Sequence, residues 1–93
     1  MNREFEWGAR KAAANLRKHG VAFEEAVSVF GDPLARIFDD PDHSDGERRE
    51  IIVGYSKRPR LLIVGFTERG GRVRLINARR VTLTELKRHE ENA

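Results

Sequence analysis

The sequence contains no cysteine. This absence excludes a disulfide framework, thiolate zinc sites, iron–sulfur clusters and cysteine nucleophiles. Long apolar runs are also missing, since the longest, Leu61 to Phe66, is far below the roughly 20 residues that a membrane helix needs. The first residues show no basic segment followed by an apolar one, so we expect no export signal and a cytoplasmic protein.

Aromatic side chains with a polar edge are scarce, because Trp7 and Tyr55 are the single tryptophan and the single tyrosine. That scarcity argues against RNA recognition by stacking of bases on a sheet. The length of 93 residues allows one small core, and we expect a single domain over residues 1–93. Apolar residues make up 39% of the chain and come in ordered clusters, which predicts a folded domain rather than disorder.

Positive charge is concentrated in the second half of the sequence. Residues 1–50 carry 8 basic and 11 acidic side chains, whereas residues 51–93 carry 10 basic and 4 acidic ones. Between positions 57 and 80 the basic residues are Lys57, Arg58, Arg60, Arg69, Arg72, Arg74, Arg79 and Arg80. In that stretch Glu68 is the single acidic residue. The local excess is typical of a surface that binds nucleic acid, although an acidic partner protein or a solvated face would also produce it.

Two helices are expected in the first third of the chain. Apolar spacing predicts the first over Ala9 to His19, with an inner face of Ala12, Ala13 and Leu16 and an outer face of Arg10, Arg17 and Lys18. Gly20 is placed to end it in the left-handed conformation. The second covers Phe23 to Phe30, because the apolar residues at 23, 26, 27 and 30 form one stripe.

Strand patterns dominate the rest of the chain. Leu34 to Phe38 is a candidate short strand, and three longer ones are expected over Arg49 to Tyr55, Arg60 to Thr67 and Arg72 to Arg79. Gly70 and Gly71 suit a tight hairpin between the last two. The strand with Leu61 to Val64 is apolar on both faces and should be central. Thr82-Leu83-Thr84-Glu85 is a capping box that opens a last helix to about Glu91.

These elements predict an α+β fold: two N-terminal helices, a curved antiparallel sheet of three or four strands, and a C-terminal helix. We expect the helices to cover one face of the sheet. The other face, on which arginine side chains of the strand over Arg72 to Arg79 are expected, is left free to bind a ligand.

Most chemical motifs fail on inspection. The acidic turn from Asp39 to Gly46 has its glycine one place late for a calcium loop that starts at Asp40. Gly65 to Gly71 has the glycine spacing of a phosphate loop but lacks the lysine and leads into a strand. The histidines His19, His43 and His89 are too scattered for a metal trio. We therefore expect no metal and no cofactor.

The arginine-rich strand remains as the candidate site. Simple alternation places Arg72 and Arg74 on one face, with Asn77 and Arg79 on the other, unless a bulge near Ile76 brings Arg74 and Arg79 together. Guanidinium groups fixed on a strand are suited to hold a phosphate and its developing charge. Cross-strand salt bridges, for example between Arg74 and Glu68, are the alternative explanation.

The chain also resembles a known family, the BrnT-type toxins of bacterial type II toxin–antitoxin pairs. The residues that carry the resemblance are Phe5-Glu6-Trp7, Lys11, Asn15, Lys18-His19-Gly20-Val21, Phe23-Glu24-Glu25-Ala26, Phe30-Gly31-Asp32-Pro33, His43, Ser44, Gly54, Leu61-Leu62, Thr67-Glu68-Arg69, Arg74, Ile76, Ala78-Arg79 and Glu85. Each motif is short, but together their order and spacing are specific. The chain departs from the family pattern at Gly8, Phe66, Asn77 and His89.

The resemblance implies a RelE-like ribonuclease toxin that blocks translation by cleaving RNA. It also implies a ribbon–helix–helix antitoxin of the BrnA type, which forms a hetero-oligomer with the toxin and links it to DNA indirectly. RNA is the expected substrate, the ribosome is a further candidate partner, and no membrane partner is expected.

For the reaction we expect metal-independent cleavage in which the RNA 2′-hydroxyl is the nucleophile. Arg74 and Arg79 are the candidate phosphate clamps, and Glu68 or His89 the candidate proton-transfer group. Candidate RNA-binding residues are Lys18, His19, Lys57, Arg58, Arg60, Arg72 and Arg80. A non-catalytic RNA- or ribosome-binding module, neutralised by an antitoxin, is the alternative function.

Overall fold

The structure is a computed structural model that describes residues 4–40 and 48–91, and of His89 the backbone alone. Its elements follow one another as β1 (Glu4–Glu6), α1 (Ala9–His19), α2 (Phe23–Val27), a short 3-10 helix (Ser28–Gly31), β2 (Arg36–Asp39), β3 (Glu50–Tyr55), β4 (Leu61–Arg69), β5 (Arg72–Arg80) and α3 (Leu83–Glu91). The class is α+β, as the sequence predicts. The predicted second helix is shorter than expected, because its last turn tightens into the 3-10 helix. Of the predicted acidic turn, Asp39 is instead the last residue of β2, and residues 41–46, which include His43, lie outside the described residues.

The sheet has five strands in the order β1-β5-β4-β3-β2, so β4 is central as predicted. The prediction of a three- or four-stranded antiparallel sheet is wrong on two counts. It misses β1, and it misses the parallel pairing of β1 with β5, in which Glu4, Phe5 and Glu6 lie opposite Arg72, Val73 and Arg74. Only three residues pair, across 68 positions of sequence, so no local pattern marks this strand.

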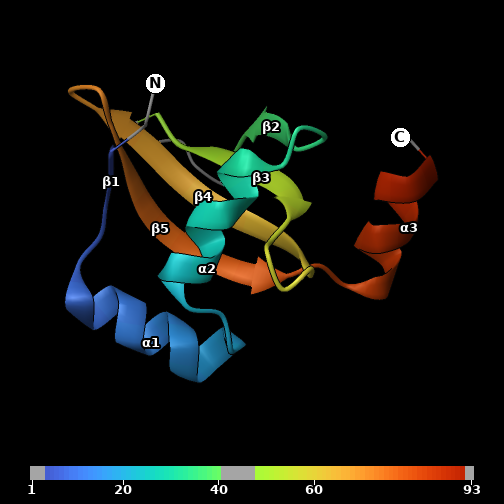
Figure 1. Cartoon of the computed structure of the whole chain (residues 1–93), viewed down its shortest axis with the longest axis horizontal. Coiled ribbons are helices and arrows are strands. Elements are labelled where there is room, and N and C mark those ends of the chain that lie inside the picture. Colours follow the sequence, from blue (N-terminus) through green and yellow to red (C-terminus); the bar gives the residue numbers. More distant parts are fainter. Residues whose placement is uncertain (1–3, 41–47, 92–93) are drawn as a thin grey trace.

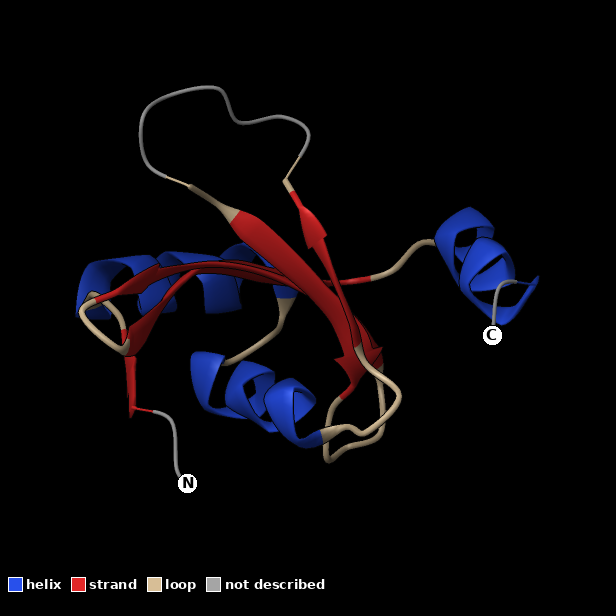
Figure 2. Ribbon diagram, turned by 90° about the horizontal axis from the view of Figure 1, so that it is seen from above, coloured by secondary structure: helices blue, strands red, loops and turns tan. Residues whose placement is uncertain are grey.

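Whereas α1 lies along the free edge of β5, α2 and the 3-10 helix cover one face of the sheet, and the core lies between them and that face (Figures 1 and 2). Its fully buried members from the helical region are Val21, Phe23, Ala26 and Val29, and those from β4 and β5 are Leu62, Val64, Phe66, Val73, Leu75 and Ala78. Edge-to-face ring contacts connect Phe5 to Phe30 and Phe30 to Phe66. This aromatic row fastens β1 to the core and so holds the start of the chain beside β5.

A bulge in β5 decides which side chains share a face. Phe66 lies opposite Leu75, but its neighbour Gly65 lies opposite Asn77, so Ile76 is the extra residue. Because one added residue inverts the alternation, Arg74 and Arg79 both point away from the helix-covered face. The bulged alternative from the sequence is therefore the observed one.

The inner face predicted for α1 is confirmed for Ala12, which packs against the core, and wrong for Ala13 and Leu16, which are exposed. Leu16 is 52% exposed, and the residue that α1 buries is Asn15. The reason is that α1 lies along the part of β5 that β1 leaves unpaired. There Asn15 meets the backbone N–H and C=O of Ala78, which its polar side chain satisfies. Gly20 ends the helix in the left-handed conformation, with a φ of 69°, as predicted.

The C-terminal helix α3 has the predicted capping box. The Thr82 Oγ1 accepts from the Glu85 N–H at 3.2 Å, and a Glu85 carboxylate oxygen accepts from the Thr82 N–H at 2.8 Å. The expectation that every helix covers one face is wrong for α3, which stands beyond the end of the sheet (Figure 2). Leu83 at its start is 85% exposed, so α3 has no apolar face buried against the core at that point.

Gly54 in β3 gives a test of the packing between the sheet and the segment after α2. A Cβ at this position would lie 2.7 Å from the Cβ of Ala35 and 3.0 Å from a carboxylate oxygen of Asp32. We expect Gly54→Ala to lower the free energy of unfolding by about 1–3 kcal/mol, because no small shift relieves both contacts. Urea denaturation measures this. Gly31→Ala is the matched control, since a Cβ there meets nothing within 4 Å, and equal midpoints for the two variants would contradict the prediction.

Candidate functional site

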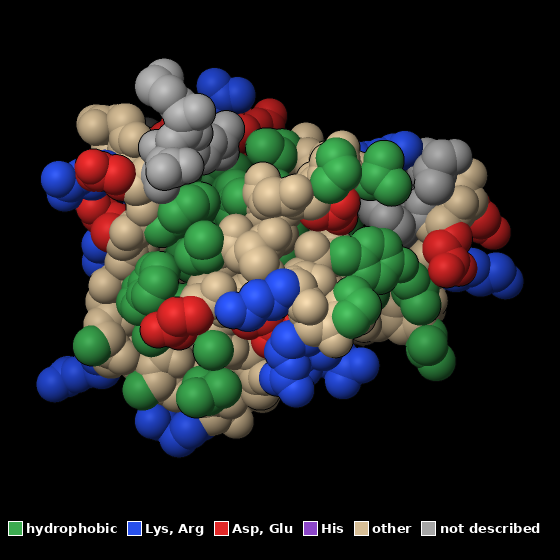
Figure 3. Space-filling model, in the orientation of Figure 1, with side chains coloured by type: hydrophobic (Ala, Val, Ile, Leu, Met, Phe, Trp, Pro, Cys, Tyr) green, Lys and Arg blue, Asp and Glu red, His purple; other side chains and the backbone are tan. Residues whose placement is uncertain are grey.

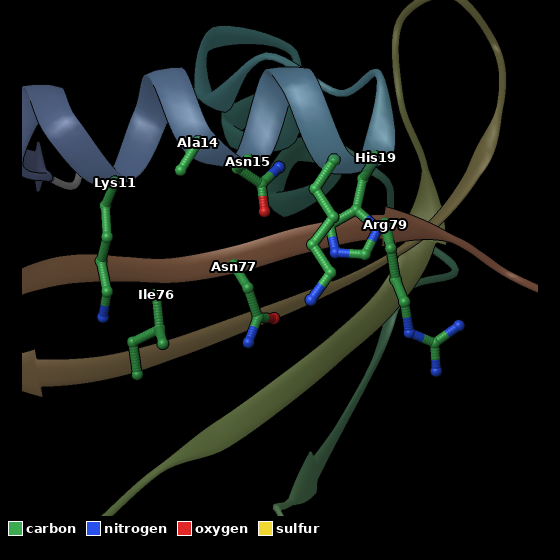
Figure 4. Close-up of a pocket in the computed structure, with 8 residues that line it drawn as sticks. Lys11, Ala14, Asn15, His19, Ile76, Asn77 and Arg79 are labelled. Carbon is green, nitrogen blue, oxygen red and sulfur yellow. The ribbon is translucent and has the colours of Figure 1, made fainter.

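A cationic pocket opens between α1 and the second half of β5. Its volume is about 410 Å³, and its lining residues are Lys11, Ala14, Asn15, Lys18 and His19 from α1 with Ile76, Asn77 and Arg79 from β5 (Figure 4). None of these eight residues is acidic, and three carry a permanent positive charge. We refer to this site as the α1–β5 pocket.

The residues of α1 that line the pocket are spaced in the sequence as one face of a helix. The five residues stand at positions 11, 14, 15, 18 and 19, which is the i, i+3, i+4, i+7, i+8 pattern of one helix face. The prediction of helix faces from apolar positions alone missed this pattern. Reading the same periodicity for polar residues would have placed Lys11, Asn15 and Lys18 on one stripe.

Asn15 joins the two walls of the pocket. Its side-chain amide donates to the carbonyl oxygens of Val21 at 2.9 Å and Ala78 at 2.8 Å, and its side-chain oxygen accepts from the Ala78 N–H at 3.0 Å. The amide thus replaces a neighbouring strand at the edge of β5, two residues after the bulge. This contact fixes α1 against the part of β5 that carries Asn77 and Arg79.

Asn77 occupies the open face directly opposite Gly65. A Cβ on Gly65 would lie 2.8 Å from the side-chain oxygen of Asn77, so glycine provides the space in which this amide lies. Asn77 is one of the positions where the chain departs from the family pattern. It lies in the α1–β5 pocket and is exposed, so the departure changes a hydrogen-bonding group of the pocket.

Arg79 is held by the first turn of α3. Its two terminal nitrogens donate to the two carboxylate oxygens of Glu85, each at 2.9 Å. The side-chain hydrogen bond from Arg79, with the backbone hydrogen bond from Thr82, lowers the pKa of Glu85 to about 2. The same hydrogen bond raises the pKa of Arg79, so this pair is fully ionised at neutral pH.

Arg74 and Arg72 are paired with β1 instead. Arg74 donates to Glu6 at 3.1 Å, and the Nε of Arg72 donates to Glu4 at 3.1 Å. The Arg74–Glu68 bridge, which was the example given for the alternative explanation, is absent, because Glu68 lies opposite Val73 and so points to the other face of the sheet. Arg74 shares the open face with Arg79 but does not line the α1–β5 pocket.

The two candidate proton-transfer groups are placed differently. Glu68 stands exposed at the hairpin end of β4, on the opposite face from Arg79, and the structure does not bring it to the α1–β5 pocket. The backbone of His89 lies in α3, and its side chain is outside the described part of the structure. The histidine that does line the pocket is His19, which the sequence analysis proposed only for RNA binding.

The turn between β3 and β4 gathers three further candidate residues at α2. Arg60 donates through its Nε to the buried carboxylate of Glu25 at 3.0 Å, and Arg58 lies 3.8 Å from the same carboxylate. The Lys57 backbone N–H donates to the Ser28 hydroxyl. Hydrogen bonding to Arg60 lowers the pKa of Glu25 despite its burial. Arg60 therefore has a clear structural role, fastening the turn to α2.

Charges of both signs mix on the face that carries α1 and α2 (Figure 3). Arg80 is exposed and, by its pairing with Leu62, lies on this helix-covered side. The structure thus brings Lys18, His19 and Arg79 together in the α1–β5 pocket. It places Arg72, Arg80 and the residues of the β3–β4 turn elsewhere.

Phe66, another departure from the family pattern, is buried in the core against Phe30, with 1% of its surface exposed. This position therefore faces away from the α1–β5 pocket. Gly8 lies at the start of α1, where an added Cβ would be 3.8 Å from a terminal nitrogen of Arg74. Neither departure removes a group from the pocket.

Comparison with solved structures identifies the fold. The crystal structure of the Brucella abortus ribonuclease toxin, BrnT, is similar to this chain with a TM-score of 0.67, covering 87% of this chain and 99% of that one. The two sequences are 19% identical, so the likeness establishes the architecture alone. The α+β fold with α1 at the sheet edge is thus the one seen in that structure.

The sequence model of one family matches residues 7–85, and that family is described as the ribonuclease toxin, BrnT, of type II toxin–antitoxin systems. The chain therefore belongs to the BrnT family, which confirms the resemblance drawn from its motifs. No curated protein sequence matches the chain. Within the described residues no helix is long and apolar enough to cross a membrane.

The Arg79–Glu85 pair should stabilise the folded protein at neutral pH and lose this contribution in acid. Because the pKa of Glu85 is lowered to about 2 in the folded protein, the contribution of the pair is complete above the ordinary carboxyl pKa near 4.5 and is lost as pH falls towards 2. Both side chains are more than a third exposed, so we expect only about 1 kcal/mol at pH 7. Urea denaturation of wild type and Glu85→Gln should show a difference at pH 7 that vanishes near pH 2. A difference independent of pH would contradict the assignment.

Proposed function

We propose that this toxin is a metal-independent endoribonuclease of the mRNA interferase type, and that the α1–β5 pocket holds the scissile phosphate of RNA. The observation that carries the proposal is the meeting of Lys11, Lys18, His19 and Arg79 around one pocket without an acidic lining residue. Cationic side chains that converge from a helix and a strand are suited to bind a phosphodiester and to stabilise the charge that develops on it.

RNA supplies its own nucleophile for such a reaction. The 2′-hydroxyl attacks the adjacent phosphorus, and the bond to the 5′-oxygen breaks. The products are a 2′,3′-cyclic phosphate and a 5′-hydroxyl end. The protein needs to align the phosphate, neutralise its oxygens, accept the proton that the 2′-hydroxyl loses and return a proton to the leaving 5′-oxygen.

We assign these tasks to residues of the α1–β5 pocket. Arg79 binds two phosphate oxygens, and Lys11 and Lys18 add positive charge from the facing helix. His19 is the proton-transfer group, since histidine changes charge closer to neutral pH than any other ordinary side chain. Arg74 binds a neighbouring phosphate on the same open face of β5. Glu68 lies on the other face and takes no part, whereas His89 remains a candidate from α3.

Membership of a type II toxin–antitoxin family implies an antitoxin partner. We propose that this partner is a ribbon–helix–helix protein of the BrnA type, which forms a hetero-oligomer with the toxin and connects it to DNA. The same proposal includes a cytoplasmic location and the inhibition of translation through RNA cleavage. Toxin and antitoxin co-expressed and analysed for assembly size would test the pairing.

The cleavage test uses purified antitoxin-free toxin and a defined single-stranded RNA, with and without EDTA, followed by mapping of the ends. Cleavage that survives EDTA and leaves 2′,3′-cyclic phosphate ends is the expected result. Loss of cleavage in EDTA would contradict metal independence. His19→Ala should slow cleavage while RNA binding persists.

Intact free RNA would direct the experiment to translating ribosomes, where cleavage of bound mRNA would restrict the substrate to the ribosome complex. Intact RNA in both assays, with binding that weakens as salt rises, would replace the enzyme by the non-catalytic RNA- or ribosome-binding module. The two assays together therefore separate the functions that the basic residues allow.

A further inference from the structure

The guanidinium of Arg79 is hydrogen-bonded to Glu85 along one edge only. The Nη1 and Nη2 groups face the carboxylate, and Nη1 also donates to the Arg80 carbonyl at 3.2 Å. A guanidinium has five N–H donors, so three are used. The remaining donors, on Nε and Nη2, have no partner within the described part of the chain. They lie side by side on the second edge, which matches two oxygens of a phosphate.

Glu85 is itself fixed on its far side. Its Oε1 accepts from the Thr82 N–H at 2.8 Å, and its own N–H donates to the Thr82 hydroxyl at 3.2 Å. The carboxylate that holds Arg79 is thus built into the start of α3 and cannot turn freely. The rest of α3 stands away from the sheet, beyond the end of β5 (Figures 1 and 2).

Two roles for this carboxylate follow from its charge. In the first role, Glu85 takes the hydrogen bonds of Arg79 that a phosphate would need and so blocks the site. In the second role, Glu85 holds Arg79 in the orientation that binds a phosphate. The donor count decides between them, because Glu85 leaves the second edge of the guanidinium unused. A blocking carboxylate would need to cover that edge as well.

We propose that Glu85 is a positioning residue that holds Arg79 with its free edge available to a phosphate in the α1–β5 pocket. The inference rests on the proposed function, since it assigns Arg79 to the scissile phosphate. It makes α3, which contributes no lining residue to the pocket, a part of the site through this pair. An arginine side chain samples many rotamers when unheld, so fixing it lowers the cost of aligning the phosphate.

The test measures single-turnover RNA cleavage by wild type, Glu85→Gln, Arg79→Ala and the double variant. Glutamine keeps the size and the oxygen that caps α3 but can accept from only one Arg79 nitrogen at a time. We expect Glu85→Gln to slow cleavage about tenfold, in the range of a lost orienting hydrogen bond to a charged group. Because Glu85 acts only through Arg79, the double variant should be no slower than Arg79→Ala.

Two matched variants separate positioning from a loss of charge or of helix. Glu90→Gln removes the same charge from an exposed site on α3 and should cleave like wild type. Thr82→Ala removes the hydroxyl that accepts from the Glu85 N–H but keeps the backbone N–H that donates to the Glu85 carboxylate. The carboxylate therefore stays on Arg79, and this variant should also retain cleavage. Binding of 2′-O-methyl RNA, which lacks the nucleophile, shows whether affinity or rate is affected.

Each outcome bears on one claim. If Glu85→Gln cleaves as fast as wild type, or faster, the claim that Glu85 positions Arg79 is wrong. Faster cleavage would assign Glu85 a blocking role. Losses that add in the double variant, or a Thr82→Ala variant as slow as Glu85→Gln, overturn that claim too. If Arg79→Ala itself cleaves normally, the proposed clamp fails first, so the two failures are distinguishable.

Discussion

Arg79→Ala is expected to reduce RNA cleavage by about 100- to 1,000-fold, the loss seen when one donor that stabilises transition-state charge is removed. Arg79 is the cation of the α1–β5 pocket whose position is fixed, through its two 2.9 Å bonds to Glu85. Arg79→Lys should recover little, because an ammonium group keeps the charge but loses the fork that binds two oxygens. The measurement is the single-turnover rate on a defined RNA.

Arg17→Ala is the matched control for this prediction. Arg17 is exposed on α1 and does not line the pocket, and its removal changes net charge equally. Its cleavage rate should stay within about twofold of wild type, since an exposed charge outside the site acts only through screened long-range attraction. Equal rates for Arg17→Ala and Arg79→Ala would remove Arg79 from the reaction.

Asn15→Ala should be the most destabilising single change on α1. The substitution removes three hydrogen bonds and leaves the N–H and C=O of Ala78 without partners inside the protein. We expect the free energy of unfolding to fall by about 3 kcal/mol, since each buried unsatisfied polar group costs about 1–3 kcal/mol. Urea denaturation monitored by circular dichroism measures the change.

Leu16→Ala is the informative comparison, because it removes a larger apolar side chain from the next position. Leu16 is 52% exposed, so its truncation should cost less than about 1 kcal/mol. A hydrophobic scale applied to the sequence predicts the opposite order. If Leu16→Ala proved the more destabilising, α1 would have to lie on the sheet through the face that the sequence analysis predicted.

The elements that local patterns predicted are those whose signals lie within one turn or one hairpin. The left-handed Gly20, the hairpin glycines Gly70 and Gly71, and the capping box of Thr82 and Glu85 were all recognised from such signals and are confirmed. The strands β3 to β5 were found for the same reason. Their boundaries differ from prediction by one or two residues.

The features that escaped prediction depend on distant partners. The β1 strand forms because Phe5 packs on Phe30 and pairs with Val73, and the local sequence of Glu4–Glu6 predicts neither contact. The bulge at Ile76 was one of two alternatives, since alternation alone cannot show an inserted residue. Asn15 was missed as a buried residue because its partners, Val21 and Ala78, are backbone groups.

The candidate site shows the same division. Lys18, His19 and Arg79 were named from charge, and the structure places them around one pocket. Its charge also made Arg60 a candidate, but in the structure Arg60 is hydrogen-bonded to the buried carboxylate of Glu25. An arginine count therefore cannot separate structural ion pairs from a binding site, because both use the same guanidinium chemistry.

The α1–β5 pocket has one wall near the start of the chain and one near its end, since Asn15 and Ala78 stand 63 residues apart. During synthesis α1 leaves the ribosome long before β5 exists, so a nascent chain has no second wall and no edge for Asn15 to complete. A product that terminates before residue 76 would lack Asn77 and Arg79 and should be harmless to its host. If the α1–β5 pocket is the RNA site as proposed, the chain becomes competent only once its last strand is made.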